Sequence, residues 1–293
     1  MKNASSLLIG ALCLASAVLS ADIAVSNGDR IAFLGDSITH QGNSNKYGYL
    51  HLVISGLKTA GVEAVAVPAG ISGNKSNNML ERVDRDVIAK KPQWMLLSCG
   101  VNDVWHGKRG VELEPYRKNI TAICDKAEKA GIKIMILTAT MISEDPATAN
   151  NKKLAAYNDF LRSFAAQRKY LLADLNADMQ AHSAAKTNSA QNLTYDGVHM
   201  NVSGNKMMAR GILKAFGVPA EKFAEIEKVW DSIPVEIVIE NRVKADGRFQ
   251  IMKDKKITLS IAEYEQLKAK AEKAGKRPEQ YIYDHQDALP QAK

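Results

Sequence analysis

The chain has 293 residues, of which 46% are hydrophobic and 24% charged, a balance that is ordinary for a globular protein and excludes an intrinsically disordered one. The formal net charge is +7, and much of the excess lies after residue 240, in basic runs without interleaved aromatic residues. Because such runs are typical of a solvated surface, we expect no nucleic-acid partner.

The first 21 residues have the pattern of a secretory signal peptide. Lys2 is followed by an apolar run from Leu7 to Leu19 and by small residues up to Ala21. The run is shorter than the roughly 20 residues that a spanning helix needs, and an uncleaved anchor is the alternative. No later segment is apolar for long enough to cross a bilayer. We therefore expect a secreted or periplasmic protein without stable membrane insertion.

Two cysteines, Cys99 and Cys124, follow the predicted signal peptide. Export permits a disulfide. However, Cys99 ends a predicted buried strand and Cys124 lies within the next predicted helix, so we favour two buried free thiols. Neither the cysteines nor the histidines have the spacing of a metal site. We expect no metal, and the chemistry argued below requires no organic cofactor.

Strand and helix patterns alternate after the signal peptide. The predicted strands cover residues 30–35, 63–67, 93–98, 132–138 and 170–175. The predicted helices cover residues 47–60, 77–90, 114–130, 149–169 and 204–216. This alternation predicts an α/β layer fold with a mainly parallel sheet. Ligands of such sheets lie outside the carboxyl ends of the strands.

The pattern changes from Gly217 onward. Residues 235–240, 249–252 and 257–259 predict further strands, with a hairpin turn at residues 246–247. Residues 260–274 predict a helix that Ser260 caps and Gly275 ends. We treat residues 217–293 as an appendage of unknown role, which packs against the main domain or forms a homodimer contact.

Four short stretches carry the residue types of serine-based chemistry. They are Gly35-Asp36-Ser37, Pro68 to Gly73, Cys99 to Trp105, and Asp196 to His199. Ser37 and Asn102 each follow the end of a predicted strand, so we expect both on one rim of the sheet. Alone, the first stretch is a common turn, and Ser37 could simply cap a helix.

With all four stretches in order over about residues 28–216, the chain resembles the SGNH (GDSL-type) hydrolase family. The resemblance implies a flavodoxin-like three-layer sandwich with a five-stranded sheet. It assigns residues 22–216 to a hydrolase domain and does not extend to the appendage. The family usually has proline after its catalytic histidine, where this chain has Met200. That departure concerns the entry of the following helix.

Ser37, His199 and Asp196 are the predicted catalytic triad. A serine needs a base within hydrogen-bond reach. Asp196 and His199 are close enough in sequence for the carboxylate to accept from one imidazole nitrogen while the other nitrogen faces Ser37. The alternative for this pair is a solvated surface turn.

The resemblance implies an oxyanion hole formed by the Ser37 and Gly73 amides and the Asn102 side chain. Gly70 competes with Gly73, although the family spacing favours the second glycine. Asp36 and Asp103 flank the site, and we expect them to hold their loops rather than to raise the basicity of the base.

His40, Trp105 and His106 are candidates for the wall of the substrate pocket. An indole beside a catalytic rim suits stacking on a sugar ring, while a place in the hydrophobic core is an equally weighted alternative for Trp105.

The predicted function is that of an exported serine esterase. A carbohydrate O-acetylesterase acting on a glycan is the first choice, because of the export signal, Trp105 and the lack of a long apolar lid. A lysophospholipase or thioesterase of the same family is the alternative among enzymes. A non-catalytic glycan-binding protein is the alternative of another class.

Overall fold

The computed structural model describes residues 23–187, 192–245, 248–276 and 281. The predicted signal peptide and the predicted turn at residues 246–247 lie outside the described residues. Among those that are described, no helix is long and apolar enough to cross a bilayer.

Five parallel strands form the central sheet, in the order β2-β1-β3-β4-β5. The strands are β1 (Arg30–Gly35), β2 (Val65–Gly70), β3 (Trp94–Ser98), β4 (Lys133–Leu137) and β5 (Leu171–Ala173). All five were predicted, with ends that differ by a few residues. All five β3 residues are buried, as expected of a strand covered on both faces. The structure thus confirms the predicted parallel α/β sandwich.

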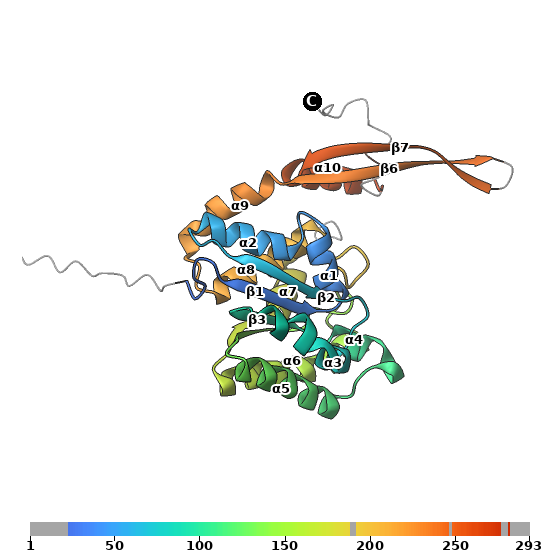
Figure 1. Ribbon diagram of the computed structural model, residues 1–293. Helices are drawn as coiled ribbons and strands as arrows, with labels where there is room; N and C mark the ends of the chain where they lie inside the picture. Colours follow the sequence, from blue (N-terminus) through green and yellow to red (C-terminus); the bar gives the residue numbers. More distant parts are fainter. Residues whose placement is uncertain (1–22, 188–191, 246–247, 277–280, 282–293) are drawn as a thin grey trace, which may run out of the picture.

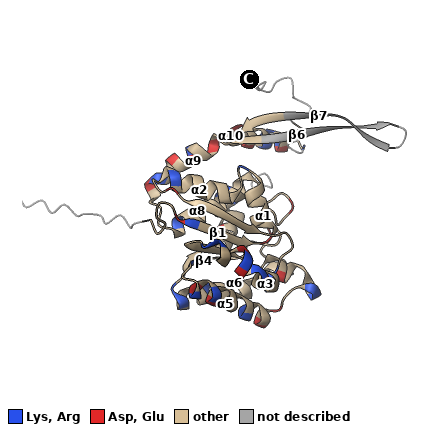
Figure 2. Cartoon of the chain, in the orientation of Figure 1, with Lys and Arg blue, Asp and Glu red and all other residues tan. Residues whose placement is uncertain are grey.

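Helices cover both faces of this sheet (Figure 1). One layer contains α2 (Tyr49–Thr59), α7 (Leu175–Ala185), α8 (Val202–Ala215) and α9 (Phe223–Asp231). The other contains α3 (Ser76–Asp86), α5 (Leu113–Lys129) and α6 (Ala149–Arg168). The helices carry most of the charged residues, whereas the sheet between them carries few (Figure 2). One continuous hydrophobic core fills the space between the layers.

Four helices were not predicted: α1 (Ser37–Ser44), α4 (Val101–Trp105), α7 and α9. α1 is short and polar, and α4 has only five residues, so neither can show an apolar stripe of helical period. α7 is rich in alanine and buries only Leu175, Asn176 and Met179. The predicted helix over residues 77–90 ends at Asp86 and continues as a 3₁₀ turn, Ile88–Lys90.

The appendage contains a long antiparallel hairpin of β6 (Pro234–Ala245) and β7 (Arg248–Ser260), followed by α10 (Ile261–Lys273). The three short strands predicted here are therefore two long ones. The expected helix is confirmed, because Ser260 and Glu263 form a capping box at its start. A second, small hydrophobic cluster joins Leu259, Ile261 and Leu267 to Val202 of α8. The hairpin and α10 lie on the α2 side of the molecule (Figure 1).

Between the sheet and the hairpin, α9 belongs to the main hydrophobic core. Phe223, Ile226 and Trp230 are buried in it, and the Trp230 indole N–H donates to the Leu52 carbonyl at 3.0 Å. The core therefore continues well past Gly217.

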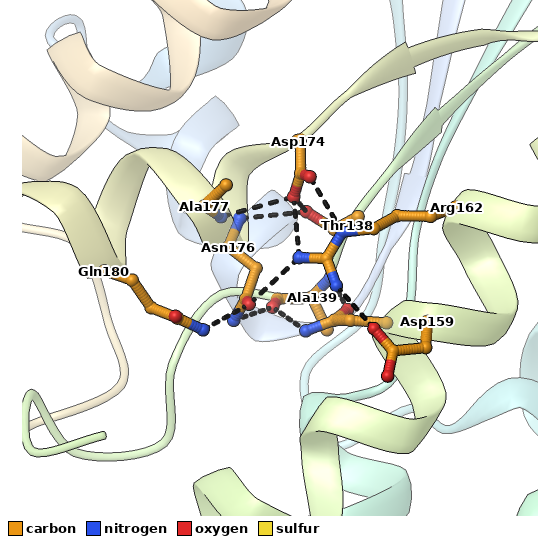
Figure 3. A network of polar contacts seen from close by, with 9 residues as sticks. Thr138, Ala139, Asp159, Arg162, Asp174, Asn176, Ala177 and Gln180 are labelled. Atoms are coloured by element: carbon orange, nitrogen blue, oxygen red, sulfur yellow. Dashed lines mark hydrogen bonds and ion pairs between the residues drawn. The ribbon is translucent and has the colours of Figure 1, made fainter.

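A polar network ties the carboxyl ends of β4 and β5 to the neighbouring helices (Figure 3). Arg162 of α6 donates to both carboxylate oxygens of Asp174, at 2.8 and 3.0 Å. Asp174 caps α7 and accepts from the Thr138 hydroxyl, which in turn accepts from the Asn176 N–H. These contacts fix the start of α7, which leads toward the segment that carries Asp196 and His199.

Cys99 and Cys124 are free and buried, as predicted. Burial raises the pKa of both thiols, so both stay protonated. No group of three or more His, Cys, Asp or Glu side chains within the described segments is arranged to hold a metal ion.

Candidate active site

Ser37 is the first residue of α1 and lies two residues after the end of β1. Asp36 caps the helix by accepting from the Ile38 N–H at 2.9 Å. The N–H groups of a first helical turn lack partners within the helix and favour a negative charge. The turn thus presents the Ser37 hydroxyl and its amide together at the rim of the sheet.

The segment from Thr194 to Met200 forms a tight turn that carries Asp196 and His199. Thr194 and Met200 pair as an isolated bridge, and the Tyr195 N–H donates to the His199 carbonyl at 3.1 Å. Within the turn, one Asp196 oxygen accepts from the backbone N–H groups of Val198 and His199.

The structure brings Ser37, His199 and Asp196 into one hydrogen-bonded chain. The Nε2 atom of His199 lies 2.8 Å from the Ser37 hydroxyl oxygen, and its Nδ1 atom lies 2.6 Å from the second Asp196 oxygen. Partial burial acts to raise the pKa of Asp196, but the hydrogen bonds from His199 and Val198 outweigh it and hold the pKa below its ordinary value. Asp196 is therefore ionised at neutral pH and can accept from a protonated imidazole.

Ser143 and Glu144, in the loop that follows β4, hold this turn in place. The Ser143 N–H donates to the Gly197 carbonyl at 2.7 Å. The Glu144 carboxylate accepts from both the Thr194 N–H and hydroxyl, at 2.8 and 2.5 Å, and pairs with Lys186 at 3.0 Å. The sequence analysis did not identify these contacts, because the partners of Glu144, Thr194 and Lys186, are far away in the chain.

Asn102 lies in α4, just beyond the carboxyl end of β3, so it shares the rim with Ser37 as predicted. Its side-chain nitrogen donates to the Asp36 carboxylate at 3.3 Å and to the Asn74 carbonyl at 3.1 Å. Both partners are acceptors, which fixes the NH₂ end of the amide toward the serine turn. Gly100, with φ of +133°, allows the abrupt change from strand to helix.

Gly70 and Gly73 have different surroundings. A Cβ at Gly70 would lie 2.4 Å from the His40 backbone nitrogen, so this glycine permits β2 to pack against α1. Gly73 has φ of +77° and open space around it. The assignment of the Gly73 amide as the donor to a bound oxyanion stays a prediction.

Asp36 is 2% exposed and is held by Ile38 and Asn102. Burial raises its pKa to about 6, the Ile38 N–H opposes this shift, and the nearby Asp103 carboxyl adds to it. Asp103 accepts from the Ser76 N–H and hydroxyl, at 3.0 and 2.6 Å, and fixes the start of α3. Burial raises the pKa of Asp103 as well. The contacts of both carboxyls match the expected role of holding loops.

Arg82 of α3 links two of the four motif stretches, which the sequence analysis did not identify. Its guanidinium donates to the carbonyls of Gly35 and Ala69, at 2.8 and 2.9 Å, and to the Asn74 side chain at 2.7 Å. It also pairs with Asp86 at 3.0 Å. The side chain is only 6% exposed, although arginine is usually found at the surface. One cation thereby sets the spacing of the ends of β1 and β2.

The three candidates for the pocket wall lie within or just after the motif stretches of Ser37 and Asn102. His40 is exposed on α1, three residues after Ser37. Trp105 is 44% exposed at the end of α4, so its alternative place in the hydrophobic core is wrong. His106 follows it, with ring centroids 6.3 Å apart. Their contact with substrate stays a prediction.

Tyr195 was not identified from the sequence. Its ring lies 5.8 Å from the His199 ring at an interplanar angle of 18°, and its hydroxyl donates to the Gln41 side-chain oxygen at 2.7 Å. It precedes Asp196 directly, which is the one signal that could have drawn attention to it.

Two proteins named as esterases are similar to this chain in sequence. An acetylxylan esterase from Geobacillus stearothermophilus is 26% identical over 212 residues, which are 66% of this chain and 96% of that protein. Esterase TesA from Pseudomonas aeruginosa is 27% identical over 161 residues, 55% of this chain and 75% of that protein.

Two solved structures are also similar. An acetyl xylan esterase named AlAXEase is 32% identical, with a TM-score of 0.58 over 64% of this chain and 98% of its own. An acetyl-xylooligosaccharide esterase from Geobacillus stearothermophilus, solved as a mutant, is 25% identical, with a TM-score of 0.61 over 67% of this chain and 97% of its own.

The fold and these relatives define the class, which is an ester-hydrolysing enzyme of α/β architecture. A family model described as the GDSL-like lipase/acylhydrolase family matches residues 33–207, and the chain belongs to this family. The resemblance seen in the four motif stretches is thereby confirmed.

Proposed function

We propose that the protein is a carbohydrate O-acetylesterase that works through an acyl-enzyme on Ser37. The hydrogen-bonded chain from Ser37 through His199 to Asp196 is the observation that carries this proposal. The printed names of its relatives, acetylxylan esterase and acetyl-xylooligosaccharide esterase, support an acetylated xylan or its oligosaccharides as the substrate class.

In the proposed first half-reaction, His199 takes the Ser37 proton on Nε2 while the serine oxygen attacks the acetyl carbonyl carbon. Asp196 accepts from Nδ1 and stabilises the imidazolium that forms. The tetrahedral oxyanion accepts hydrogen bonds from the Ser37 and Gly73 amides and from Asn102. His199 then gives its proton to the sugar oxygen as the ester bond breaks, which leaves acetyl-Ser37.

In the second half-reaction, His199 removes a proton from water, and the hydroxide attacks the acetyl group on Ser37. Collapse of this second tetrahedral intermediate releases acetate and returns the proton to the serine oxygen. Each half-reaction needs only groups of this chain, the ester and water.

The test compares wild type with Ser37→Ala on acetylated xylan and on p-nitrophenyl acetate. We expect acetate release from both substrates by wild type, and loss of at least about 1,000-fold in kcat for the variant. Acetate release that persists in Ser37→Ala would refute the proposed nucleophile.

A lipid or thioester substrate is the second candidate, favoured by the similarity to esterase TesA. A series of p-nitrophenyl esters from acetyl to palmitoyl decides between the two. Our proposal expects the highest kcat/KM for acetyl, and a maximum at long acyl chains would overturn it. The alternative of a non-catalytic glycan-binding protein predicts glycan binding but no turnover of any ester.

Export and dimerisation belong to the same proposal. We expect mature protein outside the cytoplasm that lacks residues 1–21, which N-terminal sequencing of the exported protein checks. We also propose that the β6–β7 hairpin forms a homodimer contact, because both of its edges lack a neighbouring strand among the described residues. A monomer in sedimentation-velocity experiments would contradict the contact.

A further inference from the structure

Exposed apolar side chains concentrate around the candidate active site. Five large ones are exposed in the described part of the chain: Val65, Ile71, Trp105, Tyr195 and Val229. Three of these, Ile71, Trp105 and Tyr195, belong to the segments that carry Gly73, Asn102 and His199. Tyr195 is the most exposed, at 62%.

Tyr195 is exposed and at the same time held in place. Its backbone N–H donates to the His199 carbonyl at 3.1 Å, and its ring lies nearly parallel to the imidazole. Its hydroxyl reaches Gln41, which lies four residues after Ser37 in α1 and therefore on the same side of that helix. The ring thus bridges the nucleophile helix and the His199 turn.

The Tyr195 ring lies where the alcohol half of the ester would be bound. In the proposed mechanism, the leaving oxygen must come within hydrogen-bond reach of His199 Nε2, since this atom supplies its proton. The group attached to that oxygen therefore lies beside the imidazole, where Tyr195 is the exposed neighbour. The oxyanion donors, in contrast, would donate hydrogen bonds to the carbonyl oxygen of the acyl half.

We propose that Tyr195 and Gln41 form a subsite for the sugar ring that carries the acetyl group. The inference rests on the proposed function and names the residues that would bind the alcohol half of the ester. An aromatic face offers an apolar platform for the C–H face of a pyranose, and tyrosine combines such a face with a polar end. The Gln41 amide also carries two N–H donors that suit sugar hydroxyls.

The test uses two acetyl esters that differ only in the alcohol, acetylated xylotetraose and ethyl acetate. Tyr195→Ala should lower kcat/KM for the sugar ester about five- to tenfold more than for ethyl acetate, mainly through KM. Tyr195→Phe keeps the ring and should stay within about twofold of wild type in this ratio. Val65→Ala, an exposed residue at the start of β2, is the matched control and should leave the ratio unchanged.

A second readout does not depend on turnover of the sugar. Xylotetraose should inhibit ethyl acetate hydrolysis competitively, and Tyr195→Ala should raise its inhibition constant by a similar factor. Equal losses on both esters, with an unchanged inhibition constant, would overturn the subsite and reduce Tyr195 to a support for His199. Wild type that hydrolyses ethyl acetate but releases no acetate from the sugar would instead overturn the proposed function, and the subsite with it.

Discussion

Asn102 is the residue whose removal separates catalysis from folding most clearly. Its amide makes two hydrogen bonds at the rim of the sheet. Loss of one oxyanion donor typically costs about 100- to 1,000-fold in kcat. We expect Asn102→Ala to show this loss with an unchanged circular dichroism spectrum. A variant that kept more than a tenth of the wild-type kcat would remove Asn102 from the oxyanion hole.

Asp36 should make stability depend on pH in the direction opposite to that of most carboxyls. Its pKa is about 6 in the folded protein, against 3.8 for an exposed carboxyl. The folded state therefore binds more protons between these values, and the contribution of Asp36 to stability grows as the pH falls from 7 to 4. A pKa difference of this size corresponds to about 3 kcal/mol.

Comparison with Asp36→Asn isolates this effect, because the asparagine side chain does not titrate. Urea unfolding of both proteins at pH 7 and pH 4 should show the wild type gaining about 2 kcal/mol relative to the variant on acidification. A difference that does not change with pH would mean that the pKa of Asp36 is the same in the folded and unfolded states.

At this scale the sequence indicated the residues that lie in short recognisable motifs. Asp196 and His199 are three residues apart, and Ser37 follows the end of a predicted strand, so their types and positions indicated the chemistry. Arg82 and Tyr195 contact residues far away in the chain, at Gly35 and Gln41. Local pattern carries no record of such contacts, and a buried arginine on a helix looks like any surface arginine.

At the scale of elements, α3 holds the ends of β1 and β2 together through the hydrogen bonds of Arg82. Lysine keeps the charge but cannot reproduce the planar fork that reaches Gly35, Ala69 and Asn74. We expect Arg82→Lys to cost about 2–4 kcal/mol in the free energy of unfolding, because buried acceptors lose their donors. It should also lower kcat, since the Ser37 and Gly73 segments lose their common support.

Arg85→Lys is the matched control for this experiment. Arg85 lies in the same helix and also contacts Asp86, but its side chain is 74% exposed. Such a substitution should cost less than about 0.5 kcal/mol in urea unfolding and leave kcat unchanged. Equal costs for the two variants would refute the special position of Arg82.

The loop after β4 supports the His199 turn in a comparable way. Glu144→Gln would place an amide N–H₂ against the Lys186 ammonium or against the Thr194 donors. We expect kcat to fall about tenfold with little change in KM, because the base loses its alignment while the substrate surface remains. Asp145→Asn, at the exposed neighbour, provides the comparison. A change in KM alone would argue against positioning.

Most of the longer strands and helices were predicted from their apolar runs or stripes, although α9 was missed despite its buried Phe223, Ile226 and Trp230. α1 and α4 were missed although they carry Ser37 and Asn102. Both follow strand ends and are stabilised by side chains of other segments, Tyr49 against Thr39 of α1 and Asp36 against Asn102 of α4. Short elements of this kind gain their stability from tertiary contacts rather than from local propensity.

For the whole molecule, the position of α9 decides where the chain can be shortened. A chain that ends after Gly217 loses Phe223, Ile226 and Trp230 from the main core. Removing a buried tryptophan alone costs about 3–5 kcal/mol. We therefore expect this truncation to unfold or aggregate, whereas a chain that ends after Ile233 should fold and keep most of its esterase activity. Thermal unfolding and acetate release measured on both truncations check this prediction.

The change in the residue pattern at Gly217 was visible in the sequence, but the packing of α9 against α2 was not. The contact depends on Trp230 reaching the Leu52 carbonyl across 178 residues. The two long strands of the hairpin were likewise read as short pieces, because charged residues interrupt their apolar alternation.

The proposed nucleophile, Ser37, and its proposed base, His199, are 162 residues apart in the chain. Synthesis releases Ser37 early, and His199 emerges only after all five strands of the sheet have been made. Under the proposed mechanism, no N-terminal portion of the chain that lacks His199 can act as a complete esterase. The chain would therefore be unable to cleave esters during most of its own synthesis, and would become active only after the segment with Asp196 and His199 has been made and has folded.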